Sequence, residues 1–174
     1  SLIDGLCELS LKDPLTGLPN RRYVQAVLER EIDRVARTGE AALLLMLDVD
    51  HFKRVNDTHG HLAGDVVLQS IARTIETCVR PMDTVARYGG EEFMILLKNV
   101  PKSDAYHSAE RIRQLVESTR FEGGENQPMG KVTISLGVAQ FPEDAENAEE
   151  LINQADQALY RAKRGGRNNV QLAG

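Results

Sequence analysis

The chain has 174 residues, 41% of them hydrophobic, and a formal net charge of -5 at pH 7. This length and composition are typical of one globular domain with one core. The negative charge excludes the broad basic field that attracts nucleic acid or an anionic membrane, so we expect neither as a partner. No apolar run approaches the roughly 20 residues of a membrane span, and no signal-peptide pattern is present. We expect a cytoplasmic domain, and the sequence leaves open whether the full-length protein is tethered to a membrane.

Residues 1–12 differ from the rest of the chain. Leu2, Ile3, Leu6 and Leu9 have the spacing of an amphipathic helix, and the chain begins at Ser1. We interpret this segment as the end of a linker or signalling helix from a missing upstream region, either a sensor or a membrane segment. The catalytic or binding domain is then expected over residues 13–174.

The first half of the chain predicts a helix, a buried strand and a second helix. Asn20 is placed to cap a helix whose apolar spacing continues as far as Gly39. The unbroken apolar run 41–49 favours a strand buried on both faces, although periodicity alone also allows a helix. One apolar stripe then predicts a helix over 62–79, which Arg80 and Pro81 end.

A hairpin and three further elements complete the predicted set. Strands are expected over 84–88 and 93–97, joined at a Gly-Gly-Glu-Glu tip whose glycines allow positive φ. Ser103 is expected to cap a helix that continues to Val116. β-Branched residues predict a strand over 131–140. A helix over 146–164 and a possible edge strand over 169–172 follow.

These elements predict an α+β (α/β) fold. Behind the leading helix, the order βαββαβ is that of a ferredoxin-like, polymerase-palm-like core with a central mixed sheet, to which C-terminal additions are joined. A right-handed crossover makes the first two strands parallel, with the third between them and antiparallel to both. Both helices of this unit should cover one face of the sheet. Asp48 and Glu91 are then expected at the same end of adjacent strands.

Two carboxylates at one sheet end are typical ligands for Mg²⁺, which prefers oxygen and keeps positions for water and phosphate. In nucleotidyl transfer such a site neutralises the α-phosphate and the leaving pyrophosphate. The alternative is an ordinary hairpin with exposed acids.

Six segments in register resemble the GGDEF family of diguanylate cyclases, here in its GGEEF form. They cover nearly the whole chain: 13–22 (DPLTGLPNRR), 48–57 (DVDHFKRVND), 60–65 (GHLAGD), 87–93 (RYGGEEF), 135–139 (SLGVA) and 158–168 (ALYRAKRGGRN). The resemblance implies an enzyme that joins two GTP into cyclic di-GMP with release of two pyrophosphates. It also implies Mg²⁺ as the cofactor, with Mn²⁺ as a possible substitute.

The resemblance assigns the metal ligands to Asp48, Glu91 and the carbonyl of Val49. Glu91 is also expected to act as the base or to orient the attacking hydroxyl. Glu92 receives a supporting catalytic role, because neighbouring strand residues point to opposite faces. For Asp50 a metal role and a cap or loop contact are both open.

GTP binding is expected to involve three further groups of residues. Asn56 and Asp65 are implied to recognise guanine, since a carboxylate accepts from both N1 and N2 hydrogens, and His61 lies in the same segment. Alternatively, Asp65 is a residue near a helix N-terminus, where the helix dipole favours a negative charge. Phe52 and Lys53 are expected to hold the β and γ phosphates. Lys163 and Arg167 resemble the second phosphate clamp, although a solvated basic helix end is the alternative.

The resemblance also implies a homodimer and a product site. Each 3′-hydroxyl must attack the α-phosphate bound to another domain, so catalysis needs a two-fold dimer. Arg80 and Asp83 form an RxxD motif that resembles the inhibitory site for cyclic di-GMP; a local ion pair is the alternative.

Three other functions of the chain are also considered: a cyclic di-GMP sensing module without catalysis, an enzyme for adenine-containing cyclic dinucleotides, and a structural interaction domain.

Overall fold

The computed structural model describes residues 11–121 and 131–174. The helix predicted at the start of the chain therefore lies almost entirely outside the described residues. At residue 12 the backbone already forms an isolated antiparallel bridge with Pro19. The boundary at residue 13 stays a prediction.

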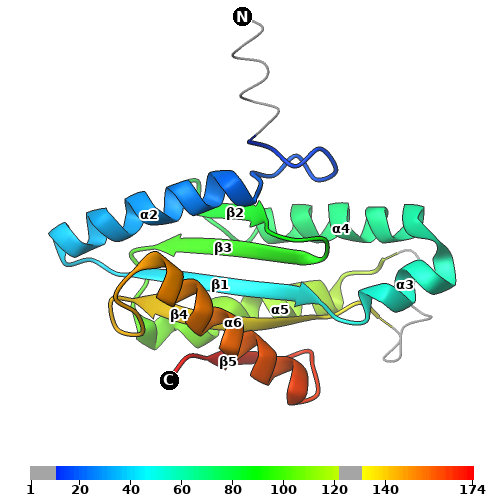
Figure 1. Ribbon diagram of the computed structural model, residues 1–174. Helices are drawn as coiled ribbons and strands as arrows, with labels where there is room; N and C mark the ends of the chain where they lie inside the picture. Colours follow the sequence, from blue (N-terminus) through cyan, green and yellow to red (C-terminus); the bar gives the residue numbers. More distant parts are fainter. Residues whose placement is uncertain (1–10, 122–130) are drawn as a thin grey trace, which may run out of the picture.

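A five-stranded mixed sheet with the order β2-β3-β1-β4-β5 forms the centre of the fold (Figure 1). The strands are β1 (Ala42–Val49), β2 (Thr84–Arg87), β3 (Glu92–Lys98), β4 (Ile134–Phe141) and β5 (Val170–Leu172). β3 is antiparallel to β1 and β2, so it lies between them as predicted. β4 is antiparallel to β1 and parallel to the edge strand β5. All eight residues of β1 are buried, which confirms a strand covered on both faces.

Helices cover both faces of the sheet. α4 (His61–Glu76) and α5 (Ala105–Ser118), the helices of the βαββαβ unit, share one face as predicted, while α2 (Arg21–Thr38) and α6 (Ala148–Arg164) cover the other (Figure 1). Alternate residues of β1 serve the two cores: Leu45 packs with the α4 and α5 side, and Leu44 with the α2 and α6 side. The period-2 alternation of a strand explains this division. The predicted ferredoxin-like core is confirmed, and the leading and closing helices complete it.

The ends of the helices show which local predictions are correct. Asn20 caps α2 by accepting from the Tyr23 N–H at 3.0 Å, and Gly39 ends it with φ of 76°. The predicted Ser103 cap is wrong. A 3₁₀ turn over Lys102–Asp104 precedes α5, and Asp104 occupies the N-cap without a side-chain bond. Ser103 lies inside that turn, away from the first amides of the α-helix.

Two helices near the site differ from prediction. α3 (Phe52–His59) is an additional short helix that the apolar pattern does not announce, because it buries only Phe52 and Val55. α4 ends at Glu76, earlier than the predicted residue 79. Val79 still packs against the core although the backbone there is no longer helical. The helical spacing of apolar residues therefore continues beyond the end of the helix. Within residues 11–121 and 131–174, no helix combines the length and apolar character of a membrane span.

Candidate functional site

The paired carboxylates lie where β1 and β3 end side by side. Asp48 stands opposite Glu92 in the β1–β3 ladder, and the Val49 N–H donates to the carbonyl of Glu91 at 3.1 Å. The hairpin closes through bonds from the N–H groups of Tyr88 and Gly89 to the Glu92 carbonyl. The prediction that this topology brings Asp48 and Glu91 to one sheet end is confirmed.

The hairpin glycines have a different role from the one predicted. Neither Gly89 nor Gly90 adopts a positive φ, so that part of the prediction is wrong. The loop between β2 and β3 covers residues 88–91 and does not need the left-handed residues of a two-residue turn. Gly89 leaves room for the Glu92 carboxylate, since a Cβ there would lie 2.6 Å from Glu92 Oε1 and the end of that side chain would have to shift.

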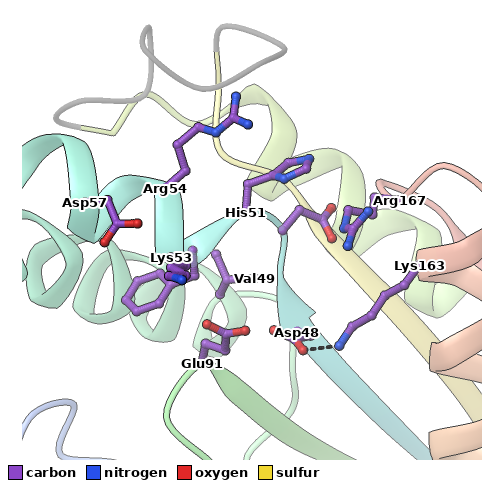
Figure 2. Close-up of a pocket in the computed structure, with 11 residues that line it drawn as sticks. Asp48, Val49, His51, Lys53, Arg54, Asp57, Glu91, Lys163 and Arg167 are labelled. Carbon is purple, nitrogen blue, oxygen red and sulfur yellow. Dashed lines mark hydrogen bonds and ion pairs between the residues drawn. The ribbon is translucent and has the colours of Figure 1, made fainter.

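The electrostatics of the carboxylates favour a cation. Asp48 is 5% exposed; its Oδ2 accepts from Lys163 Nζ, whereas Oδ1 is buried without a partner in the described part of the chain (Figure 2). Burial and then the neighbouring Asp48 raise the pKa of Glu91 to about 7, against the opposing influence of Lys163. The pKa of Glu92 is also raised, by burial, Asp48 and Asp156. Bringing a divalent cation between Asp48 and Glu91 would relieve this repulsion.

These donors fit an open metal site. Among residues 11–121 and 131–174, no group of three or more His, Cys, Asp or Glu side chains could enclose a metal ion. Asp48, Glu91 and the Val49 carbonyl would supply three oxygen ligands, and a set of this size leaves positions for water and phosphate oxygens, which is the arrangement that Mg²⁺ prefers. The orphaned Asp48 Oδ1 is a ligand atom in need of a partner.

One side of this acidic end opens into a hollow of about 460 Å³. It brings together the predicted phosphate residues Phe52, Lys53, Lys163 and Arg167, and Figure 2 shows Lys163 reaching from α6 to Asp48. His51, Arg54 and Asp57 also line it and were missed because α3 was not predicted. Phe52 and Lys53 begin α3, so their N–H groups belong to a helix N-terminus, where anions bind readily.

A second hollow of about 590 Å³ shares Asp48, Phe52, Lys53 and Glu91 with the first. It collects the predicted guanine residues Asn56, His61 and Asp65 from α3 and α4. Leu68, Arg87, Gly90 and Glu92 complete its lining. The two hollows are therefore adjacent, with the carboxylates lining both, and are together called the depression.

Asn56 is poised as a hydrogen-bond acceptor. Its Oδ1 is buried and has no partner within the described residues. Gly64 makes this placement possible, because a Cβ at Gly64 would lie 1.9 Å from that oxygen. Close packing of α3 on α4 thus positions Asn56.

Arg87 is a site residue that sequence reasoning missed. Its Nη2 donates to the Gly90 carbonyl at 2.8 Å and its Nη1 to Asp13 Oδ1 at 3.1 Å. Its backbone N–H donates to the Pro19 carbonyl at 3.0 Å. Arg87 therefore ties the turn after residue 12 to the tip that carries Glu91. Its position at the start of the segment 87–93 was the available indication.

For Asp50 the geometry favours the loop contact over the metal role. The side chain is buried, and both carboxylate oxygens accept hydrogen bonds: Oδ2 from Thr133 Oγ1 at 2.8 Å and Oδ1 from Ser135 Oγ at 2.7 Å. The Asn168 N–H adds a third, at 3.0 Å to Oδ2. Its oxygens are therefore already engaged.

The RxxD motif lies outside the depression. Arg80 donates to both carboxylate oxygens of Asp83 at 2.9 and 3.0 Å, and Asp83 also accepts from the Lys98 N–H. The local ion pair is therefore present. The Arg80 side chain remains 45% exposed and borders a hollow of about 460 Å³ that Arg111 and His107 also line. Arg111 is a second cation there that the sequence analysis missed.

The fold and the site define an α+β domain with a palm-like sheet that presents paired carboxylates to a nucleotide-sized polar depression. Residues 10–169 match the family described as diguanylate cyclase, GGDEF domain, and the chain belongs to this family.

Known relatives agree with this assignment. The chain is 42% identical to diguanylate cyclase A of Treponema denticola over 97% of its own length and 46% of that protein. It is 40% identical to response regulator PleD of Caulobacter vibrioides over 97% of its length and 37% of that protein. The coiled coil and GGDEF domain of DgcB from Caulobacter crescentus, solved with c-di-GMP, superposes with a TM-score of 0.89 at 33% identity, covering 99% of this chain and 90% of that one. The chain thus spans less than half of the curated relatives.

Proposed function

We propose that this chain is the catalytic domain of a diguanylate cyclase, which condenses two GTP into cyclic di-GMP and two pyrophosphates. The observation that carries the proposal is the position of Asp48 and Glu91 at the junction of two hollows. One hollow offers cations for phosphates, and the other offers the buried Asn56 oxygen and the Asp65 carboxylate for a purine edge. Membership of the GGDEF family supports the same chemistry.

A divalent metal fits the carboxylate pair, and we propose Mg²⁺ with Mn²⁺ as a substitute. Asp48, Glu91 and the Val49 carbonyl would hold it. When bound, it would neutralise charge on the α-phosphate and the leaving pyrophosphate and lower the pKa of the attacking hydroxyl.

The protein residues would bind, orient and move a proton. Lys53, Lys163 and Arg167 would neutralise the triphosphate, and the first amides of α3 would add N–H donors. The 3′-oxygen of one GTP forms a bond to the α-phosphorus of the other, whose bond to pyrophosphate breaks. Glu91 orients that hydroxyl and accepts its proton, and the acidic Glu92 beside it plays a supporting part.

Selection of guanine would come from Asn56 and Asp65. A carboxylate accepts from the N1 and N2 hydrogens of guanine, and adenine has no such pair of donors. The wrong base would leave the buried Asn56 oxygen and the Asp65 carboxylate unpaired, which strongly discriminates against it. His61 lies at the same hollow as a further contact. These acceptors disfavour an enzyme for adenine-containing products.

The two bonds of the product require two domains that face each other, each supplying one GTP. We therefore propose a two-fold homodimer as the active form. We propose that an upstream sensor or regulatory region, joined to the domain through residues 1–12, would set the distance between the two copies. The domain itself would lie in the cytoplasm. Specific activity should fall on dilution; a constant value over a thousandfold dilution range would contradict the dimer.

We also propose that cyclic di-GMP inhibits the domain at Arg80 and Asp83. The exposed guanidinium of Arg80 and the nearby Arg111 would meet guanine or phosphate. Arg80→Ala should raise the final yield of cyclic di-GMP and leave the initial rate unchanged. Inhibition by added product that is identical in this variant would refute the site.

The decisive experiment incubates the domain at high concentration with GTP, ATP or both, plus Mg²⁺, and identifies the products by chromatography. We expect cyclic di-GMP from GTP alone and none from Glu91→Gln. If wild-type domain binds cyclic di-GMP but forms none, the sensing module is the correct function. Adenine-containing products in the mixture would instead support the alternative enzyme.

A further inference from the structure

The turn that carries Arg167 into the phosphate hollow has an unusual backbone. Gly166, Arg167 and Asn168 have φ values of 109°, 65° and 48°. Left-handed backbone is unfavourable for residues with a Cβ, so two such residues in succession persist only where surrounding contacts hold them. The direction of the Arg167 side chain therefore depends on what holds the turn.

Contacts from several elements hold Asn168. Its N–H donates to Asp50 Oδ2 at 3.0 Å and to Ser135 Oγ at 3.1 Å. Its side chain accepts from Arg113 Nη1 at 2.8 Å and donates to Glu117 Oε2, both on α5. Among these partners, Asp50 is the buried carboxylate that accepts from the backbone of the turn itself.

Asp50 is well suited to this task. It is 4% exposed, and its own N–H donates to the Thr133 carbonyl at 2.9 Å. The hydroxyls of Thr133 and Ser135 occupy two further acceptor positions of its carboxylate. The group thus joins the end of β1, the start of β4 and the turn after α6. A bond from an N–H to a buried carboxylate is among the stronger hydrogen bonds in proteins.

We propose that Asp50 is a positioning residue, which anchors the turn at Asn168 so that Arg167 faces the triphosphate. This inference rests on the proposed function, because it takes the hollow lined by Arg167 and Lys163 as the phosphate site. Asp50 also lines this hollow, but both of its carboxylate oxygens are engaged by Thr133, Ser135 and the Asn168 N–H, so its action passes through the turn to Arg167. The same carboxylate in the segment Asp48-Val49-Asp50 therefore serves a different purpose from Asp48.

The test measures binding without turnover, by calorimetry with α,β-methylene GTP and with GMP in the presence of Mg²⁺. Asp50→Asn should weaken the triphosphate analogue about tenfold, the equivalent of one charged hydrogen bond, and change GMP by less than about twofold. Arg167→Ala should show the same pattern. In the double variant the two losses should not add, since both remove the same contact.

Asp144→Asn is the matched control. Asp144 is also a largely buried carboxylate that accepts from a backbone N–H, that of Gln140, and from Lys102, but it lies at the opposite end of β4. Its replacement should leave both affinities unchanged. If Asp50→Asn does not fold, Ser135→Ala removes two hydroxyl contacts of the same network, to Asp50 and to the Asn168 N–H, but keeps the Asp50 carboxylate. It should give a smaller loss for the triphosphate alone.

Equal losses for GMP and the analogue, or additive losses in the double variant, would overturn the positioning role. A wild-type domain that binds neither nucleotide would overturn the proposed function and this inference together. The two failures are therefore distinguishable.

Discussion

Replacing Gly64 by Ala should separate nucleotide binding from stability. In a helix interior, Ala is about 1 kcal/mol more favourable than Gly. The new Cβ would lie 1.9 Å from Asn56 Oδ1, 3.0 Å from its Cγ and 3.1 Å from Phe52 Cζ. All three atoms belong to side chains and none to the backbone, so they can yield. Because Asn56 Oδ1 has no partner in the described part of the chain, its displacement breaks no internal hydrogen bond.

We expect the free energy of unfolding of Gly64→Ala to stay within about 1 kcal/mol of wild type. The KM for GTP should rise about tenfold, because one hydrogen bond to guanine is lost. Urea unfolding and steady-state kinetics measure the two quantities. Ala63→Gly, at the adjacent helical position, is the control and should lower stability without raising KM. An unchanged KM in Gly64→Ala would show that Asn56 does not contact the base.

Three further predictions follow from other contacts. Gly137→Ala should destabilise the domain by about 3 kcal/mol in urea unfolding, because its Cβ would lie 2.2 Å from the backbone of Ala155 and of Leu159, which cannot yield; near-native stability would contradict this packing. Burial raises the pKa of Asp83, but hydrogen bonds from Arg80 and the Lys98 N–H outweigh it, so the folded pKa lies below 3.8. That stabilisation is present above pH 3.8 and is lost as the pH falls through the folded pKa. Asp83→Asn should thus have a lower free energy of unfolding than wild type at pH 7, and this difference in stability should shrink in acid. A difference that stays constant from pH 7 to 3 would contradict the lowered pKa of Asp83. Arg87→Lys should reduce kcat about tenfold, since an ammonium cannot reproduce the fork that joins Asp13 and the Gly90 carbonyl; a wild-type kcat would remove Arg87 from the site.

The local sequence pattern was sufficient to predict the structure wherever a residue type has a single structural role. The Asn20 cap, the Gly39 stop and the fully buried β1 all agree with prediction. Their causes lie within a few residues of chain, in a side-chain oxygen, a missing Cβ or an unbroken apolar run. The order of elements and the handedness of crossovers then place β3 between β1 and β2.

Local pattern failed where packing between elements decides the outcome. α3 buries only two side chains, so no periodicity announces it, and with it His51, Arg54 and Asp57 were missed. Gly89 was expected to supply a positive-φ turn conformation, but its φ is not positive. Ser103 has the chemistry of a cap, yet the preceding turn displaces it from the helix start.

The sequence by itself determined the sheet, the family and the identity of the carboxylates that β1 and β3 bring together. Each depends on the order of residues along the chain. Only the tertiary structure decided between the two roles of Asp50, because its partners Ser135 and Asn168 are distant in sequence. Hydrogen bonds between distant segments produce no periodic pattern in the sequence. A buried carboxylate that binds a ligand therefore cannot be distinguished, from sequence alone, from one that anchors a turn.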